Sequence, residues 1–138
     1  MVANQNPIYT LSPDIQWGAT LLTTANTAKD GTGTQLTVFT ADATNGGYVS
    51  KITFRPTGTA TASVGRIFIN NGSTNATPAN NILYAEVALP AITLSEIASQ
   101  PEYSMQLGFA LPAGYKLNCT VGTTVAAGYA VSVVGGKY

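Results

Sequence analysis

The residues best able to transfer protons in this chain are its carboxylates, because the sequence contains six Asp and Glu but no histidine. Histidine is the usual general base and nucleophile activator near neutral pH, so a Ser-His-Asp or Cys-His site is excluded. Two carboxylates in one cleft suffice for glycoside hydrolysis. Here the carboxylates are spread singly and form no motif, so we predict that the protein is not an enzyme. They are Asp14, Asp30, Asp42, Glu86, Glu96 and Glu102.

Cys119 is the single cysteine of the chain and has no partner for an internal disulfide. It shares one face of a predicted strand with the apolar residues Leu117 and Val121, and no basic residue on that face lowers its pKa. We therefore predict a small buried hydrophobic residue rather than a nucleophile. A zinc site of Cys and His ligands is excluded by counting, and the sequence predicts no metal and no cofactor.

Two segments, 29–34 and 42–47, combine Asp and Gly in a way that superficially suggests a calcium or phosphate loop. Neither has the ligand number or spacing of an EF-hand, and segment 29–34 lacks the Gly-Lys-Ser/Thr ending of a P-loop. We predict turns that hold no ligand.

Charge is scarce and balanced, with six basic and six acidic residues and only 9% charged residues. A typical soluble domain carries about 25%. The basic residues stand singly, whereas nucleic-acid binding requires clustered Lys and Arg, so we predict no direct nucleic-acid partner. No apolar run approaches a membrane span or a signal peptide, which predicts no membrane partner and synthesis and folding in a cytosol.

The elements that position these residues are predicted to be strands, because apolar residues alternate with period two between short clusters of Gly, Asn and Pro. This pattern predicts an all-β fold, an antiparallel β-sandwich of about eight or nine strands. An N-terminal arm over 1–14 precedes a single sandwich domain over 15–138. The predicted strands are 8–11, 15–24, 35–40, 48–55, 63–70, 82–89, 103–109, 116–121 and 129–134.

Alternation also predicts which side chains face the core. Residues 103, 105, 107 and 109 share one inward face, and Leu83 to Leu89 repeat the pattern at odd positions. Lys116, Asn118 and Thr120 are expected to face outward. The pair Gly135-Gly136 is expected to form a turn, and segment 94–98 is either a helical turn or an irregular edge.

Aromatic and basic residues supply the candidate contacts with other proteins, since Tyr, Trp and Arg are enriched at interfaces. For Trp17 we favour a core or sheet-edge anchor over a sugar platform. Arg55 and Arg66 either pair with carboxylates across a sheet or a subunit boundary, or lie on a solvated outer face, which is the interpretation we favour. The candidate interface residues are Ile8, Tyr9, Leu11, Trp17, Arg55, Arg66 and Tyr138.

Four segments carry a family resemblance: 7–10, 24–34, 66–72 and 111–117, the last reading Leu-Pro-Ala-Gly-Tyr-Lys-Leu. Together they resemble the cement, or decoration, proteins on the capsids of tailed bacteriophages. The resemblance runs over most of the chain, and its motifs are moderately specific. It implies a jelly-roll sandwich, self-association, and docking on a shell built by another protein.

This resemblance predicts a structural virion protein on the outer surface of the capsid, made in the host cytoplasm. Its partners would be the major capsid protein and further copies of itself, as a homodimer or homotrimer. It would bridge neighbouring capsomers and stabilise the expanded head. The alternatives are a tail-fibre or receptor-binding β-sandwich module and a small carbohydrate-binding protein or enzyme.

Overall fold

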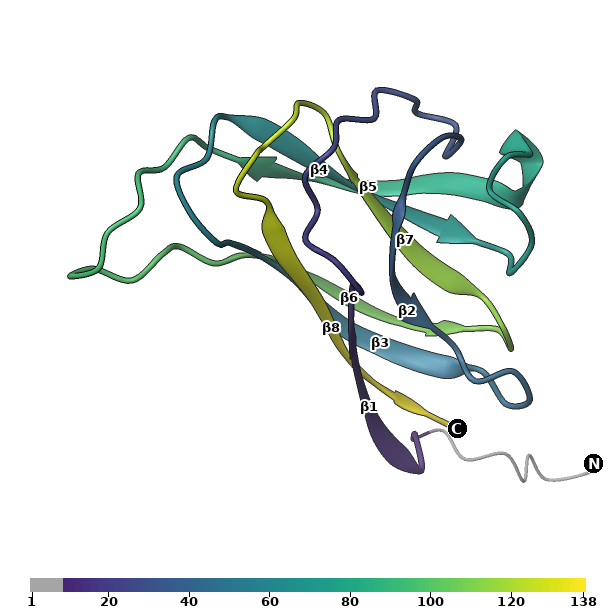
Figure 1. The fold of residues 1–138 in the computed structure, drawn as a ribbon. Helices are drawn as coiled ribbons and strands as arrows, with labels where there is room; N and C mark the ends of the chain where they lie inside the picture. Colours follow the sequence, from purple (N-terminus) through teal and green to yellow (C-terminus); the bar gives the residue numbers. More distant parts are fainter. Residues whose placement is uncertain (1–8) are drawn as a thin grey trace, which may run out of the picture.

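The computed structural model describes residues 9–138, which fold into two antiparallel sheets of four strands (Figure 1). The first sheet has the order β1-β8-β3-β6 and the second the order β2-β7-β4-β5. The strands are β1 (Ser12–Trp17), β2 (Leu36–Thr40), β3 (Gly47–Pro56), β4 (Ser63–Asn70), β5 (Asn81–Leu89), β6 (Tyr103–Leu111), β7 (Lys116–Val121) and β8 (Tyr129–Lys137), with one short 3₁₀ helix, η1 (Pro78–Asn80).

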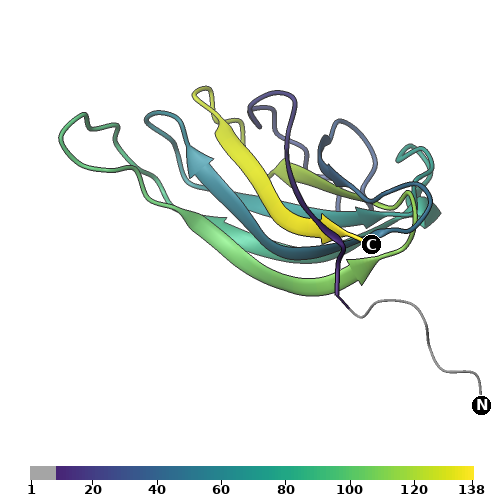
Figure 2. The ribbon, with the colours of Figure 1, turned by 90° about the horizontal axis from the view of Figure 1, so that it is seen from below.

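The pairing of strands is nested along the chain. Strand β1 pairs with β8, β2 with β7, β3 with β6 and β4 with β5, all antiparallel. The chain is thus a long hairpin rolled up on itself, which is the arrangement of an eight-stranded jelly roll. The predicted all-β sandwich is confirmed. Figures 1 and 2 show that the C-terminus lies beside the point where the chain enters β1. Within residues 9–138, no helix is long and apolar enough to cross a bilayer.

The core lies between the two sheets and is built mainly by alternate residues of the strands, although β1 contributes none of them. Phe39, Ile52, Phe54 and Leu117 are each 0% exposed. In β6, odd-numbered residues pack against the core while even-numbered ones face solvent, as predicted from alternation. The same holds for β5.

Strand β7 departs from the expected alternation, because Asn118 and Thr120 are buried. The prediction that they face outward is wrong. The connection over 18–35 crosses beside this strand, where Ala25 forms a parallel bridge with Val121 and the Asn26 N–H donates to the Val121 carbonyl at 2.8 Å. Thr37 donates from its hydroxyl to the Asn118 side chain at 2.8 Å. Segments distant in the sequence therefore cover the face of β7 that the alternation predicts to be exposed to solvent.

The two ends of the chain also differ from prediction. Strand β1 covers Ser12–Trp17 rather than 15–24, because the chain bends after Trp17 and crosses to the other sheet. Residues 12–14, placed in the arm by sequence, pair with β8. Residues 9–11 form no strand, and residue 8 lies outside the described residues. At the other end, Gly135 and Gly136 continue β8 instead of forming a turn.

Candidate functional site

Strand β1 carries apolar side chains on the side that faces solvent. Trp17 is 69% exposed and Ile15 is 57% exposed. Val134 of β8 lies in register with Ile15 and is also exposed, as is Leu11 just before the strand. We call Leu11, Ile15, Trp17 and Val134 the β1 surface. Clustered exposed apolar residues of this kind are typical of protein-binding sites.

The opposite face of β1 is polar, so this edge strand has the reverse of the usual pattern: its polar side chains face inward and its apolar side chains face solvent. Ser12, Asp14 and Gln16 are half-buried while the residues between them are exposed. The Gln16 side-chain amide donates to the Thr40 carbonyl and accepts the Thr40 N–H, both at 2.9 Å, and it also donates to Asp14 at 2.9 Å. These bonds tie β1 to β2 and close that side of the sandwich. They hold the apolar side chains in water.

The position of Trp17 excludes one interpretation left by the sequence, burial in the core. It lies on an edge strand of the first sheet, as a sheet-edge anchor would, but it is not part of the core. Beside it is an open hollow of about 470 Å³, lined by residues 17–21 and 130–132.

Arg55 belongs to an ion-pair cluster on the outer face of the first sheet. Glu102 accepts from Lys51 and from Arg55, each at 2.9 Å. The Lys51 ammonium and, more weakly, the Arg55 guanidinium lower the pKa of the Glu102 carboxyl. Of the two interpretations considered for Arg55, pairing with a carboxylate holds, although half of its side chain is exposed.

Stability is predicted to be flat between about pH 5 and 8, because no residue with an ordinary pKa titrates there. Below that range it should fall. Hydrogen bonds from Thr32, and from Asn45 and Thr44, lower the pKa values of Asp30 and Asp42, so these carboxyls and Glu102 hold protons less tightly in the folded state. As the pH drops below the ordinary values of 3.8 and 4.5, the unfolded chain takes up protons first and the free energy of unfolding decreases.

Urea unfolding from pH 3 to pH 8 measures this dependence, with Glu102→Gln as the variant that should lose part of the acid response. A marked change in stability between pH 5 and 8 would contradict the prediction.

Arg66 is buried, unlike Arg55, and the expectation of a solvated outer face is wrong for it. It is 8% exposed, and its Nε–H donates to a Glu86 carboxylate oxygen at 2.8 Å across β4 and β5. Its guanidinium also donates to the Asn26 carbonyl at 3.3 Å. The 18–35 connection that lies over Thr120 therefore also covers Arg66. The buried Arg66 links β4, β5 and this connection.

The remaining candidate interface residues fall into separate places. The Leu11 N–H donates to the Lys137 carbonyl at 2.9 Å, which brings Leu11 close to the half-buried Tyr138. Tyr9 is 83% exposed. Ile8 lies outside the described residues. The structure thus gathers Leu11 and Tyr138 at one corner, places Trp17 farther along β1 toward the end of the sheet that carries Arg55, and puts Arg66 on the other sheet.

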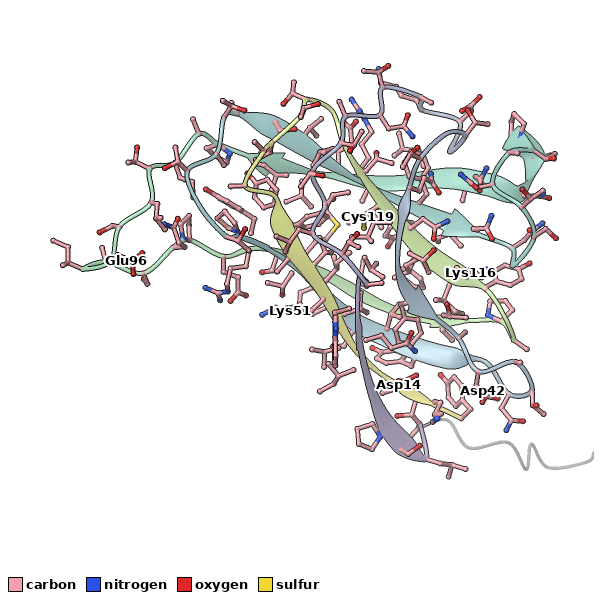
Figure 3. The ribbon with its side chains drawn as sticks, in the orientation of Figure 1. Asp14, Asp42, Lys51, Glu96, Lys116 and Cys119 are labelled. Atoms are coloured by element: carbon pink, nitrogen blue, oxygen red, sulfur yellow. The ribbon has the colours of Figure 1, made fainter. Side chains whose placement is uncertain are left out.

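The cysteine and the two turn carboxylates considered for chemistry are buried or hydrogen-bonded. Cys119 is fully buried, as predicted, and burial raises the pKa of its thiol. Asp42 accepts the N–H groups of Thr44 and Asn45, and Asp30 accepts from Thr32, so both carboxylates stabilise their own turns. Figure 3 shows Asp14 and Asp42 at one end of the molecule and Glu96 at the other. Within residues 9–138, no three His, Cys, Asp or Glu side chains form a group able to hold a metal ion.

Sequence reasoning missed two exposed apolar residues of the β1 surface, Ile15 and Val134, and the fully exposed Ile97. Alternation places Ile15 on the same face of the strand as Trp17, but it does not show which of the two faces is exposed to solvent. Nothing local distinguishes Ile97 from a buried residue.

Comparison of the chain with protein-family models, with curated proteins and with solved structures gives no match. The family resemblance of the four segments stays a prediction.

Proposed function

We propose that this protein is a cement, or decoration, protein that binds the outside of a tailed-bacteriophage capsid. Its partners are the major capsid protein and further copies of the same chain. It bridges neighbouring capsomers and stabilises the expanded head. The proposal rests on the family resemblance of the sequence segments together with one structural observation.

That observation is the inverted pattern of β1. A strand that faced only its own core and water would place Ile15 and Trp17 inward and Asp14 and Gln16 outward. Here the polar side chains are held inward by hydrogen bonds, and the apolar ones are presented outward. Removing this apolar surface from water is favourable at about 25 cal/mol per Å². The β1 surface therefore suits a protein partner, which we take to be the shell.

The low charge of the chain suits a crowded lattice. With six charges of each sign and net charge zero, neighbouring copies repel each other little at long range. Once one subunit of an oligomer is bound, the others engage at high effective concentration, so modest single-site affinity is sufficient.

A binding assay on expanded heads that lack the protein tests the proposal. Purified protein should occupy the heads and raise the temperature at which they rupture. Ile15→Ser should weaken occupancy by about tenfold or more, since an anchor residue is lost. Ile82→Ser is the matched control, because Ile82 is similarly exposed, at 63%, but lies on the edge strand β5 of the other sheet.

Absence of wild-type binding to expanded heads would contradict the proposal. Immunogold labelling that places the protein on the tail would instead support the receptor-binding alternative. Equal loss in the two variants would show that the β1 surface is not the binding face.

A further inference from the structure

The loop over 93–100, which joins β5 to β6, projects from one end of the sandwich (Figures 1 and 3). Its base is held at several points. Ala60 and Ile92 exchange backbone hydrogen bonds at 3.0 and 2.9 Å, and the Leu94 N–H donates to the Thr59 hydroxyl at 3.0 Å. On the other side, Arg55 donates to the Gln100 carbonyl at 3.4 Å. The loop therefore projects from an anchored base.

The tip of this loop presents apolar side chains to water. Ile97 is 100% exposed and Leu94 is 45% exposed. The Ser95 hydroxyl oxygen accepts the N–H groups of Ile97 and Ala98, each at 3.2 Å, which closes a local turn around the tip. An ordered turn that carries a fully exposed isoleucine has the form of a knob that inserts into another surface.

The hollow beside Trp17 has the size and the apolar lining needed to accept an isoleucine side chain. Its volume of about 470 Å³ is large enough for an aliphatic side chain, and its lining residues are all uncharged. Trp17, Leu21 and Ala130 give it apolar walls, with hydroxyls only from Thr20 and Ser132. Sugar recognition depends on several converging polar groups, so this lining favours an apolar side chain over a glycan.

The loop and the surroundings of the hollow also carry charges of opposite sign. Ala130 of the hollow lies in register with Arg55, so the cluster of Lys51, Arg55 and Glu102 adjoins the hollow and carries a net charge of +1, two cations against one carboxylate. Glu96 is the only charged residue of the loop, which therefore carries a net charge of −1. Arg55 also contacts the base of the loop, so loop and hollow lie at the same end of the sandwich.

We propose that the tip of the 93–100 loop inserts Ile97 into the Trp17 hollow of a second copy of this chain. Because knob and hollow lie at the same end, two copies facing each other exchange their loops reciprocally about a twofold axis. The proposal concerns contacts between copies in solution. It uses Trp17 of the β1 surface and leaves Leu11, Ile15 and Val134 for the shell contact proposed above.

Sedimentation of the full-length protein over a dilution series tests the contact. The wild type should dimerise, and Ile97→Asp and Ala130→Gln should each weaken the dimer by about tenfold or more. An equimolar mixture of the two variants keeps one intact knob and one intact hollow, so it should dimerise more tightly than either variant alone. Ile82→Asp is the control for adding a charge at another exposed isoleucine, and urea unfolding checks that each variant is folded.

Disulfide trapping locates the contact. Ile97→Cys mixed with Ala130→Cys should form a cross-linked dimer on oxidation, whereas Ile97→Cys mixed with Thr44→Cys should not, because Thr44 lies near Asp42 at the other end. Native Cys119 is buried and does not compete. A monomeric wild type at all concentrations, an unchanged Ile97→Asp dimer, or wild-type binding to neutral oligosaccharides that Trp17→Ala abolishes would overturn the proposal. Each of these outcomes leaves the binding assay on heads unaffected.

Discussion

Replacing Gly135 with alanine is expected to destabilise the protein by about 3 kcal/mol or more, the upper range for forcing an atom into a packed interior. A Cβ at this position would overlap the Tyr48 carbonyl oxygen and would lie 3.3 Å from the Val49 Cα. Both are backbone atoms of β3, so no side-chain rotation relieves the clash. Either β8 or β3 has to move.

The cost is high because of where β8 lies. It pairs with β1 on one side and β3 on the other, and Val49 pairs with Gly135 where the β3 register shifts. Displacing β8 at this point disturbs both ladders and the attachment of the β1 surface. Gly135→Ala should therefore also weaken any binding that depends on Ile15.

Gly114→Ala is the matched control. Gly114 has a φ of +75°, and a Cβ there would meet nothing within 4 Å. That variant measures the backbone penalty alone, about 1–2 kcal/mol. Urea unfolding followed by circular dichroism compares the two. If Gly135→Ala were no more destabilising than Gly114→Ala, close approach between β3 and β8 would not be the reason for glycine.

The strands could be predicted largely from the sequence because their signals are local. Alternation and turn residues place β4 and β7 at their observed bounds, and β5 begins one residue before the predicted run. The period of two also identifies the inward residues of β5 and β6. Sheet order does not follow from these signals, since it depends on pairs far apart in the chain.

The burial of polar residues could not be predicted either, because it also depends on contacts between segments far apart in the chain. Thr120 and Arg66 have the parity of an outer face, and only the crossing of the 18–35 connection covers them. Gly135 reads as a turn residue because local sequence does not show that another backbone approaches it.

The candidate surface was predictable in part. Leu11 and Trp17 were identified by residue type, but the inversion of β1 was not, because alternation assigns apolar residues to a core unless the polar ones have partners. Those partners, Thr40 above all, lie on another strand. In β1, pattern and structure thus disagree at the residues through which the fold presents apolar groups outward.

Removing Glu86 should cost more than removing its partner, although Glu86 is the more exposed of the two. The Arg66 side chain is 10% exposed and that of Glu86 is 46% exposed. Glu86→Ala leaves a shielded guanidinium with the Asn26 carbonyl, at 3.3 Å, as its remaining acceptor. We expect a loss of about 2 kcal/mol, below the 3–5 kcal/mol of fully buried pairs because one partner reaches water.

Arg66→Met removes the charge and keeps much of the side-chain volume, so it should destabilise less than Glu86→Ala. The double variant should recover part of the Glu86→Ala loss, because no uncompensated charge stays under the crossing connection. A double-mutant cycle in urea measures this coupling. Glu102→Ala, which breaks the exposed cluster instead, should change stability far less. Simple additivity of the two single losses would show that Arg66 is solvated despite its burial, and that the 18–35 connection does not seal the outer face of the second sheet.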